Sequence, residues 1–213
     1  MKATDLQQTF NQFILDNNHP CIMAQTVFNQ NNVLLYDYQH IADEKKSKKL
    51  LEDLNEYVVN YNFHSKKMKS FIAVFSQEKP VSEKEFEHKL WKQLQLLSNL
   101  DKHDWDNTVN ADPNHKDFSY SLLGKSFYIV GMHPNSSRLA RKSPSFALVF
   151  NLHVQFEKLR EMNIYTSIRN RIRKRDKQLQ GSINPMLEDF GEGSEARQYS
   201  GRKVEESWKC PFH

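Results

Sequence analysis

The sequence predicts an α+β fold: a single domain over residues 1–213, with helices packed on a mixed or antiparallel sheet of about five strands. Three observations favour this fold. A chain of 213 residues is long enough for one well-buried core. Short apolar runs, such as FALVFNL at 146–152, are typical of buried strands. Longer segments with apolar residues at helical spacing are typical of amphipathic helices.

The first third of the chain predicts two helices and three strands. Apolar residues at helical intervals predict helices over 4–16 and 43–60. CIMAQTVF at 21–28 and VLLYDY at 33–38 are separated by the turn residues NQNN, which predicts two strands joined as a hairpin. FIAVFS at 71–76 is expected to form a buried strand.

A capped helix and an ordered loop follow. Ser82 and Glu85 have the spacing of a capping box, in which each side chain satisfies a free amide of the first turn, and the helix is expected to run to about Leu100. Residues 101–117 are polar, but Trp105 can be buried, so we expect an ordered loop, a candidate lid.

The last third predicts strands, one long helix and a docked tail. Residues 118–132 are expected to form two strands that turn at Gly124, and 154–177 a helix. The tail is rich in Gly, Ser and Pro, a composition typical of disorder. Its large apolar residues instead favour docking on the core: Met186, Leu187, Phe190, Tyr199, Trp208 and Phe212.

Charge and composition exclude few classes of function. The net charge of +4 is small, mean hydropathy is −0.76, and the start of the chain lacks the apolar stretch of a signal peptide. We therefore expect a cytoplasmic protein without a membrane segment or a nucleic-acid partner. One basic run, Arg169 to Lys177, could bind phosphates, but isoleucines at helical spacing beside it favour a solvated helix face.

The stretch from Gly131 to His153 holds the first candidate site residues. His133 precedes Pro134 at the end of a predicted strand, so its ring has a restricted position that suits a metal ligand. Asn135 and Ser137 could supply the hydrogen bonds that orient such a ligand. The alternative is a histidine bonded to the backbone of a turn. His153 is the second candidate, its alternative role being a helix cap.

Two further motifs carry charged groups. Arg138 and Arg141 could clamp a carboxylate or a heme propionate through paired hydrogen bonds, or could be surface charges. Glu195 and Arg197, with Asp189 and Glu192, form a polar segment beside glycines that could bind a small cation such as a guanidinium. The alternative for this segment is a solvated tail.

Cys21 and Cys210 each adjoin a proline. Either thiolate could ligate iron, although a free cysteine is more often a small buried apolar residue. The chain has no CxxC, HExxH, GxGxxG or GxSxG motif and no P-loop. Zinc and dinucleotide enzymes are therefore disfavoured.

Five segments resemble the YqcI/YcgG family, also described as FPC/CPF motif-containing proteins. They are HPC at 19–21, HPNSSRLAR, FNLHVQFEKLR, the run from IRKRD to QYSGR, and WKCPF near the end. The likeness covers nearly the whole chain. It departs from the family pattern at His19, which stands where the FPC motif has phenylalanine.

The resemblance implies a function. Characterised members look like heme-dependent oxygenases that N-hydroxylate the guanidine group of arginine or an arginine-like amino acid. The expected cofactor is heme b, used with dioxygen and an electron donor or peroxide. The rival expectation is a protein that binds or transfers heme without turnover. A homodimer is compatible with the sequence.

The resemblance also implies roles for residues of this chain. We expect His133 as the iron ligand, because it lies in the densest motif, with His153 and His88 as alternatives. Heme contacts are expected from Asn135, Ser137, Arg138, Arg141 and His153. Glu195 and Arg197 are the expected catalytic residues, with Glu195, aided by Glu192, holding the guanidinium.

Overall fold

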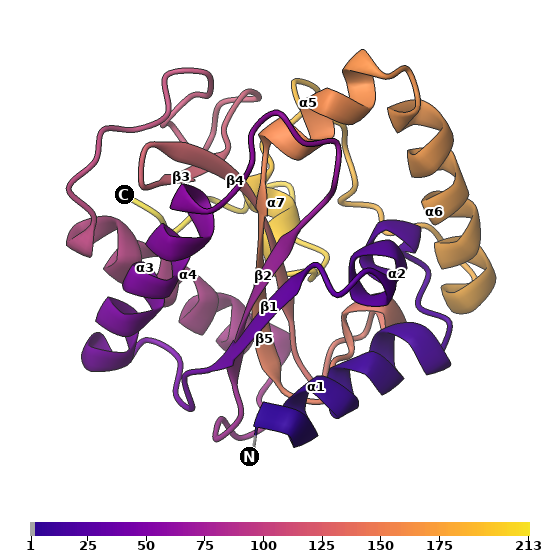
Figure 1. Ribbon diagram of the computed structural model, residues 1–213, viewed down its shortest axis with the longest axis horizontal. Coiled ribbons are helices and arrows are strands. Elements are labelled where there is room, and N and C mark those ends of the chain that lie inside the picture. Colours follow the sequence, from indigo (N-terminus) through magenta and orange to yellow (C-terminus); the bar gives the residue numbers. More distant parts are fainter. Residues whose placement is uncertain (1–2) are drawn as a thin grey trace.

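A five-stranded mixed sheet forms the centre of the molecule (Figure 1). The computed structural model describes residues 3–213, with side chains from residue 5. The strands are β1 (Val33–Asp37), β2 (Ser70–Phe75), β3 (Tyr120–Leu122), β4 (Lys125–Met132) and β5 (Phe146–Leu152), in the order β1-β2-β5-β4-β3. β1 and β2 are parallel, and the other pairs are antiparallel. The predicted α+β domain with a mixed sheet is confirmed.

Helices cover both faces of the sheet (Figure 1). α3 (Glu44–Val59) and α4 (Glu83–Leu100) lie on one face. On the other lie α1 (Ala3–Asn11), which continues as a π-helical turn to Asp16, and α2 (Ile22–Asn29). α5 (Val154–Glu161), α6 (Tyr165–Gln180), the short α7 (Ala196–Tyr199) and a 3₁₀ turn (Leu139–Arg141) complete the described elements.

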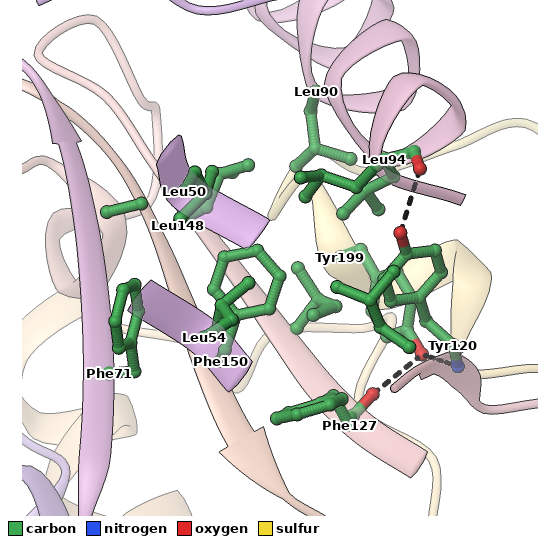
Figure 2. Packing of buried hydrophobic residues seen from close by; sticks show 14 of the residues in the cluster. Leu50, Leu54, Phe71, Leu90, Leu94, Tyr120, Phe127, Leu148, Phe150 and Tyr199 are labelled. Carbon is green, nitrogen blue, oxygen red and sulfur yellow. Dashed lines mark hydrogen bonds between the residues drawn. The ribbon is translucent and has the colours of Figure 1, made fainter. Parts of the chain in front are cut away.

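Alternation along the strands divides the core into two parts. In β5, Phe146, Leu148 and Phe150 pack with α3 and α4, whereas Ala147 and Val149 point to the side of α1 and α2. This follows from the two-residue period of a strand. Figure 2 shows the larger part, where aromatic rings of the sheet meet leucines of α3 and α4. Many of the buried side chains here are large rings, among them Phe71, Phe127 and Phe150.

The predicted helix starts and the docked tail are confirmed. The Ser82 hydroxyl accepts a hydrogen bond from the Glu85 amide at 3.3 Å, which is the serine half of the predicted capping box at the first turn of α4. In the tail, Tyr199 and Phe212 are buried, and their rings lie 5.7 and 6.3 Å from that of Trp91. The aromatic residues therefore outweigh the flexible composition of the segment.

Two predicted elements are wrong. Instead of a strand, residues 22–28 lie in helix α2, because the Cys21 side chain caps its first turn and Val27 and Phe28 are buried on one side. β1 consequently has no hairpin partner and pairs with β2 instead. The predicted helix over 154–177 is two helices, separated at Asn163, whose φ of 58° is left-handed.

The loop over residues 101–117 is ordered, as expected, but it is not a lid. The loop 101–117 packs Trp105 against Phe118 and Phe212, with ring centres 6.0 and 5.9 Å away, as an ordered loop should. It contributes nothing to the wall of the large cavity described below, so it is not positioned as its lid.

Among the described residues, no helix has the length and apolar character needed to cross a membrane.

Candidate functional site

A cavity of about 310 Å³ lies between the sheet and helices α2 and α6. Its sheet wall consists mainly of apolar side chains, Ile72, Val130 and Val149 among them. The opposite wall includes Ile168 and Ile172 of α6, which are only half-buried. Asp176 is the one buried residue of α6. The apolar side of this helix therefore faces a space of ligand size rather than the sheet.

Strand alternation decides which predicted residues reach this cavity. Tyr128 and Val130 of β4 line it, whereas Phe127 and Ile129 pack with α4. On β5, Val149 and Asn151 line the cavity, and His153 follows them at the same two-residue spacing. His153 therefore reaches the cavity.

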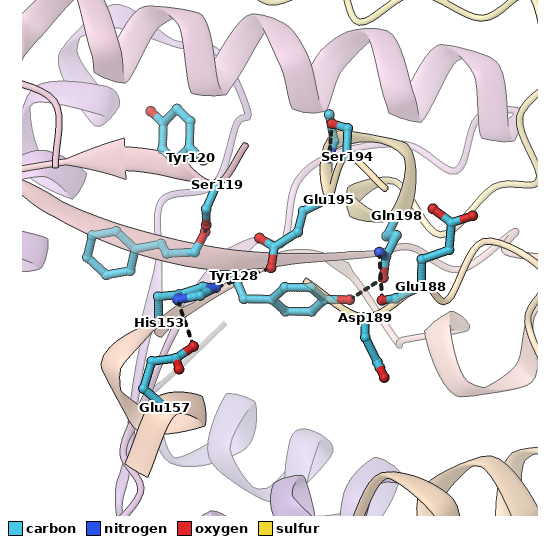
Figure 3. Close-up of polar contacts among 12 residues, drawn as sticks. Ser119, Tyr120, Tyr128, His153, Glu157, Glu188, Asp189, Ser194, Glu195 and Gln198 are labelled. Carbon is cyan, nitrogen blue, oxygen red and sulfur yellow. Dashed lines mark hydrogen bonds and ion pairs between the residues drawn. The ribbon is translucent and has the colours of Figure 1, made fainter. Parts of the chain in front are cut away.

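One end of the cavity is polar, and Figure 3 shows the residues that make it so. Glu195, at the start of α7, is 3% exposed, and its Oε1 lies 3.4 Å from His153 Nε2. Its Oε2 accepts a hydrogen bond of 3.3 Å from the Tyr199 hydroxyl. Beside this pair, the Tyr128 hydroxyl donates to Gln198 Oε1 at 2.9 Å. A buried carboxylate thus borders the cavity next to an imidazole.

Arg141 brings a buried positive charge to the same cavity. Its Nη1 donates to the Gly131 carbonyl at 3.0 Å, and no carboxylate among the described side chains pairs with it. Burial lowers the pKa of the Arg141 guanidinium, since the charged form is poorly solvated. A buried guanidinium without a counter-charge is costly, and an anionic ligand would offset that cost.

The tail fixes the position of Arg141. Gly201 has a φ of +78°, and a Cβ added there would lie 3.0 Å from Arg141 Cγ. On either side of it, Ser200 and Arg202 bind the buried Glu87 of α4, with Arg202 Nη2 2.8 Å from Glu87 Oε2. The SGR segment is thereby fastened to α4, with its glycine against the Arg141 side chain.

Arg138 differs from Arg141, although both line the cavity. Its guanidinium is ion-paired with Asp176 of α6 and donates to the Ser182 carbonyl at 2.9 Å. The Arg138–Asp176 pair joins the 3₁₀ turn to α6. Because its charge is already balanced, Arg138 is less suited than Arg141 to bind an anion.

Two histidines and one cysteine that could ligate iron line the cavity: His19, Cys21 and His153. Both nitrogens of His19 are engaged, Nε2 with the Ala140 carbonyl at 2.9 Å and Nδ1 with the Cys21 amide at 3.2 Å. The Cys21 sulfur accepts a hydrogen bond from the Ala24 amide at 3.4 Å. Burial raises the pKa of the Cys21 thiol, whereas the charges of Arg141 and Arg175 lower it.

Comparison with known proteins supplies the family. The family model described as YqcI/YcgG family matches residues 10–213. The chain belongs to the YqcI/YcgG family. It is 26% identical over 211 residues to the uncharacterized protein YcgG of Bacillus subtilis strain 168, covering 91% of this chain and 80% of YcgG. The uncharacterized protein YqcI of the same strain is 26% identical over 215 residues, covering 92% of this chain and 81% of YqcI. No solved structure matches the chain.

In this YqcI/YcgG chain, the predicted iron ligand His133 does not line the cavity. It follows Met132 on β4, so alternation turns its ring toward α4, where it stacks on Phe86 with centres 4.3 Å apart. Its Nδ1 has no hydrogen-bond partner, and burial lowers the pKa of His133. His88 is exposed on α4 and is also absent from the cavity wall.

Three other predicted site residues also lie outside the cavity. Asn135 donates to the Val81 carbonyl at 3.1 Å, and the Ser137 hydroxyl donates to Glu83 Oε1 at 2.8 Å. Both fasten the loop after β4 to the start of α4. Arg197 donates to the Glu205 carbonyl at 2.9 Å and lies over the ring of Trp208. Arg138, Arg141, His153 and Glu195 are the predicted site residues that share the cavity.

The sequence reasoning missed Tyr128, Gln198 and Asp176, all of which line the cavity. The alternating segment FYIV could have placed Tyr128 on the same face as Val130. No signal in the sequence pairs Asp176 with Arg138, because this contact joins segments 38 residues apart. Cys210 is buried in the other part of the core, on the side of α4, and does not line the cavity.

Asp189 and three arginines of the basic run on α6 have partners within the chain. Asp189 forms ion pairs with Arg169 and Arg173 of α6. Arg175 donates to the carbonyls of Asn18, His19 and Pro20. Within residues 3–213, no three His, Cys, Asp or Glu side chains are grouped to hold a metal ion.

Proposed function

We propose that the protein is a heme-dependent oxygenase that N-hydroxylates the guanidine group of arginine or an arginine-like amino acid. The observation that carries this proposal is the cavity, which combines a thiol, an uncompensated guanidinium and a buried carboxylate between apolar walls. These groups correspond to an iron ligand, an anion-binding group and a guanidinium-binding group.

The kinds of residue around the cavity fit a heme. Apolar walls suit the macrocycle, and Arg141 suits a propionate. Cys21 is our choice of iron ligand, because its sulfur lines the cavity in a helix-capping position and thiolate is an established heme ligand. His153 is the alternative, but Glu195 lies 3.4 Å from its Nε2 and would have to move to make room for iron. When bound, heme would supply the activation of dioxygen or peroxide.

Glu195 is suited to hold the guanidinium of the substrate. A carboxylate and a guanidinium form two parallel charge-assisted hydrogen bonds, which also fix the orientation of the group to be oxidised. Tyr199 and His153 contact the two carboxylate oxygens and would orient them. Because the site is buried, the interaction is stronger than it would be in water.

The position of Glu195 also weighs against the rival function. A protein that only binds or transfers heme needs no buried carboxylate in its pocket, and Glu195 is 3% exposed on the cavity wall. A nucleic-acid function is disfavoured too. Arg169, Arg173 and Arg175 of the basic run have partners within the chain and are not available for phosphates.

The test begins with purified protein and added hemin. The proposal predicts a Soret band, and one added oxygen on arginine when the holoprotein is supplied with dioxygen and a reductant, or with peroxide. Cys21→Ser should change the Soret band, and His133→Ala should leave it unchanged. Failure to bind hemin, or to oxidise any guanidino amino acid, would overturn the proposal.

A further inference from the structure

The loop between α3 and β2 carries lysines on the outer side of the cavity wall. Lys66 and Lys67 are exposed, and the next residue, Met68, lines the cavity. The end of the loop is held by Gln155 of α5, whose side chain binds both the amide and the carbonyl of Lys69, at 2.6 and 2.9 Å. Figure 1 shows the loop passing beside α5. The loop is therefore fixed in place, with two lysines exposed to solvent and Met68 in the cavity wall.

Two further lysines from other elements join this group. Lys158 of α5 binds backbone carbonyls of the loop, and it lines a surface hollow of about 240 Å³ together with Lys66 and Phe63. Lys125, at the start of β4, lies over the Phe63 ring, with its Nζ 5.5 Å from the ring centre. We call these four residues, Lys66, Lys67, Lys125 and Lys158, together with the half-buried Phe63, the lysine patch. Three separate segments of the chain thus converge on one surface.

The lysine patch carries an excess of positive charge. The chain has no Asp or Glu over residues 57–77 or 118–156, which include three of the four lysines. Two carboxylates border the patch: Glu161 lines the hollow, and Asp106 accepts a 2.8 Å hydrogen bond from the Ser126 amide beside Lys125. Four ammonium groups against two carboxylates leave the surface positive.

We propose that the lysine patch is the docking surface for an acidic one-electron carrier, a small iron–sulfur or flavin protein. This inference rests on the proposed oxygenase function and adds the class of electron donor to it. Opposite charges steer such a partner and fix its orientation, and electron-transfer complexes have small interfaces that a patch of this kind can supply. A half-buried ring among lysines also fits an interface with an apolar centre and a charged rim.

The patch lies where a carrier would be close to the cavity. Lys67 and Lys158 are followed in the chain by Met68 and Leu159, and both of these residues line the cavity. A carrier docked on the lysines is therefore separated from the cavity by the layer of residues that forms its wall. The lysines of α3 and α4 lie on helices that cover the other face of the sheet.

The electron count of the proposed reaction requires a partner of this kind. A guanidine N–H, dioxygen, two electrons and two protons give an N-hydroxyl group and water. Two reduced carriers dock in succession, each is oxidised by one electron, and solvent supplies the two protons. With hydrogen peroxide in place of dioxygen, the guanidine N–H gives the same products and no carrier is needed.

The first test needs neither heme nor turnover. The purified protein is titrated with an acidic [2Fe–2S] ferredoxin at low ionic strength, and a carbodiimide then joins lysines to the carboxylates that they contact. We expect binding that is lost at about 0.5 M salt, with crosslinks at Lys66 and Lys67. Lys66→Glu/Lys67→Glu should weaken binding by about 10-fold or more.

The matched control is Lys45→Glu/Lys48→Glu, which makes the same change of charge at two exposed positions near the start of α3. It should bind the ferredoxin as the wild type does. Absence of binding by the wild type, or equal binding by the two double variants, would overturn the proposal. Binding of an oligonucleotide through the same lysines without binding of the ferredoxin would assign the patch to nucleic acid and would also overturn it.

The second test compares two oxidants in the hemin-loaded protein. With reduced ferredoxin and dioxygen, Lys66→Glu/Lys67→Glu should hydroxylate arginine about 10-fold more slowly than the control variant. With hydrogen peroxide, which is uncharged and needs no carrier, the two variants should react at the same rate. An equal loss with both oxidants would contradict docking at the patch. If the wild type fails to bind hemin or to oxidise a guanidine, the proposed function fails, while the titration with ferredoxin still tests the docking surface.

Discussion

Glu195→Gln tests the guanidinium site most closely, because glutamine keeps the shape of the side chain and removes its charge. Glu195 is 3% exposed and accepts a 3.3 Å hydrogen bond from Tyr199, which an amide oxygen can also accept. Breaking a buried charge pair costs about 3–5 kcal/mol. Because some water enters with the ligand, we expect the lost binding free energy to lie at the low end of this range, at about 3 kcal/mol. This loss corresponds to a roughly 100-fold weaker affinity for arginine.

The assay is titration of the hemin-loaded protein with arginine, followed by calorimetry or by the Soret band. The matched control is Glu192→Gln, which lies three residues earlier, is exposed and does not line the cavity. It should bind arginine as the wild type does. Thermal unfolding of both variants checks that the fold is kept. An unchanged affinity in Glu195→Gln, in a protein with an unchanged Tm, would refute the assignment of Glu195.

Three further predictions concern Arg141, Gly131 and His133. Arg141→Gln should weaken hemin binding by roughly 10- to 100-fold, measured by Soret titration, whereas Arg171→Gln on the exposed side of α6 should not. Gly131→Ala should lower the stability by about 1–3 kcal/mol, because its Cβ would lie 2.5 Å from Leu90 Cδ1; an unchanged Tm would contradict this packing. Because burial lowers the pKa of His133 from 6.5, its contribution to stability is present above that pH and lost as the pH falls through the lower folded value. His133→Phe should therefore flatten denaturant-unfolding stability below pH 6.5, and an unaltered pH dependence would contradict the linkage.

The parts of the fold that were predicted well have strong local signals. The strand at 146–152 has the predicted bounds, because its apolar run ends at polar residues on both sides. The helix after Ser82 is set by its cap and by one apolar face. The segment 21–28 has no such signal: its apolar run suits a strand or a helix equally, and packing of Val27 and Phe28 decides in favour of the helix.

The candidate site was predicted only in part, because its geometry depends on long-range contacts. Motif density favoured His133 over His153, but strand alternation places only His153 on the cavity side. Alternation was readable in the sequence, whereas the location of the cavity was not. Glu195 and Arg141 were identified from their motifs. Their burial, and the lack of a carboxylate partner for Arg141 among the described side chains, required the folded chain.

The most direct measurement of the central claim is the fate of oxygen in a reaction with isotopically labelled dioxygen. Hemin-loaded protein, arginine and a reductant are incubated together, and the product is analysed by mass spectrometry with fragmentation. The proposed function predicts one labelled oxygen atom on a guanidine nitrogen, and a strongly reduced yield in Glu195→Gln. A protein that binds hemin and leaves arginine and other guanidino amino acids unlabelled would contradict the claim.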